Sequence, residues 1–197
     1  MRGFKKYILI CIVTILLSIP IICGVFIEFL QLRVINIISI LIFFLGLFIL
    51  LLLGFIIEVF IYNSEIFEII QKHDVVNSFI KRSNRFSTWI FFFITMIMEE
   101  LIFRYYSIGV LNSVLHLDIY LTILISSAAF SLYHIHTWLS YKDLKILIVN
   151  LVYPFFLGLY LGLLIFSFGL FSDIFAHSFI AFLMHYNIYR IYYKYTN

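Results

Sequence analysis

Residues 34–61, VINIISILIFFLGLFILLLLGFIIEVFI, contain a single charged residue, Glu58. About 20 consecutive apolar residues are enough for a helix to cross the hydrocarbon core of a bilayer, so this stretch predicts a membrane-spanning helix. The whole chain of 197 residues shares this character, because 64% of it is hydrophobic and only 12% is charged. Soluble domains carry about 25% charged residues, and the composition therefore excludes a soluble enzyme.

The same criterion, applied outward from this stretch, predicts six membrane-spanning helices. They cover residues 7–27, 34–61, 87–108, 117–141, 146–168 and 170–189. The fold class that follows is all-α, a polytopic membrane helical bundle of about six transmembrane helices. We expect two parts: residues 1–86, which hold two transmembrane helices and a linker, and residues 87–197, which form a four-helix core.

The lysines and arginines fall mostly on one side of this predicted bundle. If the N-terminus is cytoplasmic, eleven of the 13 lie inside, Arg33 lies outside and Arg104 falls within a span. Basic residues concentrate on the cytoplasmic side of membrane proteins, so we expect both termini to be cytoplasmic. The net charge of +3 then indicates attraction to anionic membrane lipids and no nucleic-acid partner.

The longest polar stretch, residues 62–86, follows the second predicted span. Its apolar residues recur at helical spacing among Glu65, Glu68 and Gln71. This pattern predicts an amphipathic helix that lies on the inner membrane surface and links the first two spans to the rest.

Three ionisable residues interrupt the third predicted span, in the sequence Met98-Glu99-Glu100-Leu101-Ile102-Phe103-Arg104. Charges at bilayer depth are costly and are functional candidates by default. Glu100 and Arg104 are four residues apart and can pair on one helix face, whereas Glu99 is turned away by about 100°. A buried salt bridge that fixes helix packing explains Glu100 and Arg104 but leaves Glu99 over. Glu99 is therefore a candidate general base.

Two further helices carry histidines within their predicted spans, at His134 and His177. Two imidazoles and one carboxylate are the protein ligands of many catalytic zinc sites, so Glu99, His134 and His177 predict either a site for one divalent metal such as zinc or a metal-free site that polarises water. A lone histidine in an apolar helix more often serves packing. Counting about 1.5 Å per residue from the inner face places His134 about 10 Å deep, Glu99 about 18 Å deep and His177 about 20 Å deep. Helix tilt or a later end to the fourth span would close this gap.

These polar residues resemble the motifs of the CAAX-protease and bacteriocin-processing family (CPBP, or Abi) of intramembrane endopeptidases. The resemblance covers residues 87–189, about half of the chain. Its motifs are the full pair-plus-arginine sequence Glu99-Glu100-x-x-x-Arg104, the sequence Phe130-x-x-x-His134, and a third motif matched only in His177.

The resemblance implies a role for each of the matched residues. Glu99 would activate the attacking water, and Glu100 would pair with Arg104. His134 and His177 would position the water, or a metal, near the scissile peptide bond. Sequence alone leaves the need for a metal open.

The third motif departs from the family at Ala181. The resemblance implies an asparagine there that helps to hold the oxyanion, and losing one such donor costs a hundredfold or more in rate. Ser178 or a backbone N–H is an alternative donor. Asp173, one turn before His177, is predicted to orient that imidazole.

The function that we expect is peptide-bond hydrolysis in a membrane-bound or lipid-attached peptide. The chain is rich in Ile, Phe, Lys and Tyr, as in low-GC bacteria, and points to a multi-pass protein of the bacterial cell membrane. The resemblance then implies bacteriocin or pheromone maturation, or self-immunity. The alternative is a non-catalytic membrane partner or immunity protein of the same fold, which Ala181 favours. A haem protein with His134 and His177 as axial ligands leaves Glu99 unexplained, and a proton-coupled transporter lacks the expected internal repeat. Nothing in the sequence indicates an oligomeric state.

Overall fold

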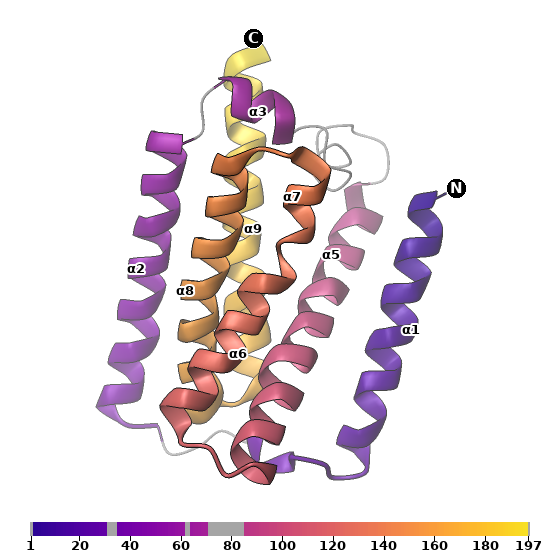
Figure 1. Ribbon diagram of the computed structural model, residues 1–197, viewed down its shortest axis with the longest axis vertical. Coiled ribbons are helices and arrows are strands. Elements are labelled where there is room, and N and C mark those ends of the chain that lie inside the picture. Colours follow the sequence, from indigo (N-terminus) through magenta and orange to yellow (C-terminus); the bar gives the residue numbers. More distant parts are fainter. Residues whose placement is uncertain (1, 31–34, 62–63, 71–84, 197) are drawn as a thin grey trace.

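The computed structural model describes residues 2–30, 35–61, 64–70 and 85–196, and these form an all-α bundle (Figure 1). The predicted fold class is confirmed in this respect. The elements are α1 (Arg2–Ile22), the 3₁₀ turn η1 (Ile27–Phe29), α2 (Ile37–Ile61), α3 (Ser64–Ile70), α5 (Arg85–Glu100), the π-helical turns η2 (Leu101–Tyr106) and η3 (Gly109–Val114), α6 (Ile119–Tyr133), α7 (His136–Tyr141), α8 (Leu144–Phe168) and α9 (Leu170–Thr196).

Consecutive long helices run in alternating directions, and both ends of the chain lie at the same end of the bundle (Figure 1). Helices α8 and α9 occupy the middle, α2 lies on one side, and α5 and α1 lie on the other (Figure 1). Within the described ranges, α2 and α8 are long and apolar enough to cross a membrane. Most of α2 is exposed, as expected for a helix that faces lipid, whereas half of the apolar stretch of α8 is buried in the bundle.

Helix α6 packs closely on α8 at two glycines of α8 that are one turn apart. A Cβ atom on Gly158 would lie 2.9 Å from Cα of Ser127, and one on Gly162 would lie 2.7 Å from Cγ2 of Ile123. Small residues four apart let membrane helices approach closely, where packing rather than water exclusion drives association. This contact fixes the position of α6, which leads into His134.

The first two helices pack on opposite sides of the core. Tyr105 and Tyr106, both in η2, donate hydroxyl hydrogen bonds to the carbonyls of Val25 and Leu17, and so hold α1 against the third long helix. On the other side, α2 packs on α8, where Tyr160 donates to the carbonyl of Phe43 at 3.1 Å.

The fourth predicted span, residues 117–141, was wrong as a single helix. Helix α6 ends at Tyr133, and α7 begins at His136 after a short turn. Nδ1 of His134 lies 2.9 Å from the carbonyl oxygen of Phe130, which its own backbone N–H would otherwise use. That N–H bonds to Ser131 instead, at 3.0 Å, which tightens the last turn and ends the helix. The third helical segment, by contrast, continues beyond its predicted end to Val114.

The predicted amphipathic helix is described only in its first part, α3. Ile66 is buried there, whereas Glu65 and Glu68 are exposed, as the pattern requires. Its continuation over residues 71–84 lies outside the described residues.

Candidate active site

The third helical segment supplies three of the predicted site residues at the junction of α5 and η2. Glu99 is 5% exposed, and Glu100 and Arg104 are completely buried. The helix changes from α to π geometry directly after Glu100. Such π-helical turns are rare and are often found at functional sites.

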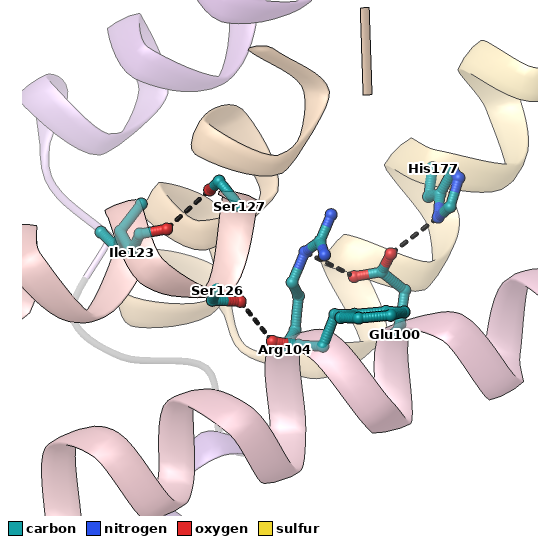
Figure 2. A network of polar contacts seen from close by, with 7 residues as sticks. Glu100, Arg104, Ile123, Ser126, Ser127 and His177 are labelled. Carbon is teal, nitrogen blue, oxygen red and sulfur yellow. Dashed lines mark hydrogen bonds and ion pairs between the residues drawn. The ribbon is translucent and has the colours of Figure 1, made fainter. Parts of the chain in front are cut away.

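Glu100 is the centre of a buried network that connects two helices (Figure 2). Its Oε2 atom lies 3.3 Å from Nε of Arg104, so the ion pair predicted from their spacing is present. Its Oε1 atom lies 2.7 Å from Nδ1 of His177, on α9. Because a carboxylate only accepts, the imidazole donates through Nδ1. The ring is then oriented with Nε2 as its second, chemically available nitrogen.

Phe130 of α6 lies where the three motifs meet. The guanidinium carbon of Arg104 stands 4.1 Å from the centroid of its ring, which is a cation–π contact. The ring of His134 lies 4.8 Å away, and that of His177 lies 5.7 Å away in an edge-on arrangement. Sequence reasoning noted Phe130 only as part of a motif; the structure shows that it packs against all three charged or polar partners.

His134 is half-buried and is close enough to His177 and Arg104 to interact with them electrostatically. The gap in depth that residue counting predicted is therefore closed, although α6 ends earlier than expected. The structure brings Glu99, Glu100, Arg104, His134 and His177 together from three helices. Their catalytic roles stay predictions.

Glu99 is the acidic residue that this network leaves over. Its Oε2 atom is buried and has no hydrogen-bond partner among the described residues. The carboxylate is within electrostatic reach of His177, Glu100 and Arg104. Leaving a buried acceptor without a hydrogen bond costs about 1–3 kcal/mol. A buried carboxylate at position 99 therefore does not stabilise the fold.

A comparison with protein families places these residues in a known context. The model of the family "Type II CAAX prenyl endopeptidase Rce1-like" matches residues 81–183, more than half of the chain. The chain belongs to this family. Comparisons with curated proteins and with solved structures gave no match. Membership of the Rce1-like family indicates a membrane-embedded protease, and the predicted resemblance is confirmed.

Asp173, which precedes the third motif on α9, does not have the partner that was expected. Asp173 does not orient His177, because Nδ1 of that ring bonds to Glu100 instead. The Asp173 carboxylate is completely buried, within electrostatic reach of Glu100 and Arg104, and neither oxygen has a partner in the described part of the chain. Ala181, where the Rce1-like resemblance implies an asparagine, is half-buried.

The donor types of the predicted metal ligands suit a divalent ion: His177 uses Nδ1 for Glu100 and would bind an ion through Nε2, within electrostatic reach of the Glu99 carboxylate. The imidazole of His134 is the third predicted ligand. Within the described ranges, however, no three His, Cys, Asp or Glu side chains are grouped as a metal site. The zinc site stays a prediction.

Proposed function

We propose that this protein is an intramembrane endopeptidase that cleaves a membrane-associated peptide or protein with a water activated by Glu99. The observation that carries the proposal is the buried Oε2 atom of Glu99, which has no hydrogen-bond partner among the described residues, in a carboxylate within electrostatic reach of the Glu100–Arg104–His177 network. Family membership supplies the reaction class.

In the proposed reaction, Glu99 accepts a proton from the attacking water and later gives it to the leaving nitrogen. The water oxygen bonds to the carbonyl carbon of the scissile peptide while its proton passes to the Glu99 carboxylate. The tetrahedral intermediate then loses the carbon–nitrogen bond, and Glu99 returns the proton to the leaving nitrogen. Glu100 holds His177 through Nδ1, so that Nε2 of this ring can accept a hydrogen bond from the attacking water. Burial excludes bulk water and leaves one bound molecule as the nucleophile.

We further propose that the bundle crosses the cell membrane six times with both termini in the cytoplasm. Alternating helix directions and the common position of the two termini support this topology (Figure 1). Lys142 and Lys145 lie at the α7–α8 connection, and Arg190 lies near the C-terminus, at that same end. Their position agrees with a cytoplasmic excess of basic residues.

The substrate class that we propose is a membrane-bound or lipid-attached peptide. The matched family is named for prenyl peptides, whereas peptide maturation or self-immunity in a bacterium would use unprenylated ones. Two probes distinguish these substrates: an internally quenched farnesylated peptide with a CAAX end, and the same peptide with an apolar helix in place of the prenyl group.

The test compares the wild type with Glu99→Gln, purified in detergent, on both probes. Glu58→Gln is the matched control, because this glutamate also lies in an apolar helix but pairs with Arg190 at the bundle surface, at 3.7 Å. We expect cleavage by the wild type and Glu58→Gln and none by Glu99→Gln. Metal analysis of the active wild type, with and without chelator, then decides whether zinc takes part.

The second candidate is a non-catalytic membrane partner of the same fold, which Ala181 favours because it lacks a donor. Folded wild type that cleaves neither probe would support this function. Equal cleavage by Glu99→Gln and the wild type would instead remove Glu99 as the base.

A further inference from the structure

Ser178, which follows His177 on α9, has a buried hydroxyl that differs from most others in its hydrogen bonding. Its Oγ atom has no hydrogen-bond partner among the described residues. A serine or threonine in a helix normally donates to the carbonyl one turn back. Among the described residues, six hydroxyls do so, those of Thr14, Ser18, Thr95, Ser127, Ser167 and Ser172.

Two serine hydroxyls donate to a carbonyl of another element instead of one in their own helix. Ser126 donates to the carbonyl of Phe103, and Ser131 donates to that of Leu151 at 2.6 Å. Among the serine and threonine hydroxyls of the described residues, the other buried one without a hydrogen-bond partner belongs to Thr122, near the start of α6 and at the opposite end of that helix from His134. Ser178 is thus set apart by its position beside a site histidine.

Ring contacts show which helix the Ser178 side of α9 faces. Residues 178, 182 and 185 are spaced by four and three and share a face. On this face Phe182 lies 5.0 Å from the ring of Trp89, and His185 lies 4.6 Å from the ring of Phe92. Both partners belong to α5. The Ser178 hydroxyl therefore faces α5, the helix that carries Glu99.

The same helix geometry places Ser178 next to Ala181. Residues three apart are neighbours on a helix surface, and Ala181 offers no side-chain donor. Peptide hydrolysis moves an electron pair onto the carbonyl oxygen when water attacks, and preorganised donors that meet this oxyanion accelerate the reaction. Arg104 engages Glu100 through Nε and the Phe130 ring through its guanidinium, and its two terminal nitrogens have no hydrogen-bond partner among the described residues.

We propose that the Ser178 hydroxyl donates a hydrogen bond to the carbonyl oxygen of the scissile peptide and stabilises the oxyanion. This inference rests on the proposed function and adds a catalytic residue to it. No bond of the serine is made or broken: its O–H donates throughout, while Glu99 carries the transferred proton. An unpaired hydroxyl in the resting protein is what such a role requires, because the donor must be available when substrate binds.

The experiment measures kcat and KM of Ser178→Ala on whichever quenched peptide the wild type cleaves. We expect kcat to fall about 100-fold or more with KM nearly unchanged. Ser172→Ala is the matched control. This serine is on the same helix, and its hydroxyl donates to the carbonyl of Phe168, four residues earlier, at 3.3 Å. It should keep the wild-type kcat.

Rescue separates a catalytic hydroxyl from a structural one. Ser178→Thr, which keeps the hydroxyl, should retain most activity, and Ala181→Asn in the Ser178→Ala background should restore part of it by supplying an amide donor. Ser178→Cys, nearly isosteric and a weak donor, gives an intermediate kcat and serves if the alanine variant misfolds.

Wild-type kcat in folded Ser178→Ala or Ser178→Cys, alongside an inactive Glu99→Gln, would overturn the role of Ser178 and leave the peptidase intact. Cleavage that does not depend on Glu99 would instead refute the proposed function itself.

Discussion

Replacing Arg104 with alanine should destabilise the folded protein far more than removing any exposed arginine. The guanidinium is completely buried, lies 3.3 Å from the Glu100 carboxylate and stacks 4.1 Å above the Phe130 ring. At this separation Coulomb attraction amounts to about 5 kcal/mol at an effective dielectric constant of about 20. Removing one partner of a buried pair costs about 3–5 kcal/mol, because the other charge stays buried without compensation.

The matched control is Arg190→Ala, which breaks an ion pair at the surface. Arg190 is 67% exposed and lies 3.7 Å from Glu58, and pairs of this kind contribute about 0.2–1 kcal/mol. At about 2–4 °C per kcal/mol for a chain of this size, Arg104→Ala should lower the unfolding midpoint by roughly 10 °C, and Arg190→Ala by about 4 °C or less.

Thermal unfolding in detergent, followed by circular dichroism, measures both variants. A double-mutant cycle isolates the pair: Glu100→Gln in the Arg104→Ala background removes the uncompensated charge, so the double variant should be more stable than the sum of the single effects. Equal midpoints for Arg104→Ala and Arg190→Ala, or strict additivity in the cycle, would refute the idea that Arg104 neutralises Glu100.

Three further predictions concern packing and the site. Gly158→Ala should lower the free energy of unfolding by about 1–3 kcal/mol, because the added Cβ would lie 2.9 Å from Cα of Ser127. Gly54→Ala is the control and should be tolerated, because its Cβ would lie 3.6 Å from the nearest atom. The unfolding midpoints of the two variants test this difference. Phe130→Leu should cost about 0.5–2 kcal/mol from the lost cation–π contact and lower kcat as well, measured by unfolding and by peptide cleavage. Glu99→Gln should abolish cleavage without lowering the unfolding midpoint, because its buried carboxylate oxygen has no partner in the described part of the chain; a large loss of stability would assign it a structural role.

Local rules predicted the helices and the Glu100–Arg104 pair, because hydrophobic length and spacing of four depend only on neighbours along the chain. These rules did not predict the end of α6 at Tyr133. That end depends on a hydrogen bond from the His134 ring to the Phe130 carbonyl, which a hydropathy pattern does not reveal. The apolar run simply continues through this turn.

The partners of the site residues were also beyond the reach of local rules. Asp173 was assigned to His177 from its place one turn away, but Glu100 reaches that imidazole from another helix at 2.7 Å. Likewise, nothing in the spacing of residues indicates that Phe130 contacts Arg104. Such contacts depend on how elements far apart in the sequence pack, α9 against α5 for His177 and α6 against η2 for Phe130.

The excess of buried acidic side chains at the site has an energetic cost that packing elsewhere must offset. Among the described residues it gathers three buried acidic side chains, Glu99, Glu100 and Asp173, around the single arginine Arg104. Burying acids in excess of bases opposes folding, so the core must offset that cost elsewhere. The α6–α8 contact holds the helix that leads into His134. Tyr105 and Tyr106, in the π-helical segment that carries Arg104, bond to the carbonyls of Val25 and Leu17. These contacts hold the elements that carry the cluster while Oε2 of Glu99 has no hydrogen-bond partner among the described residues, and in the proposed reaction this oxygen binds and activates the water molecule.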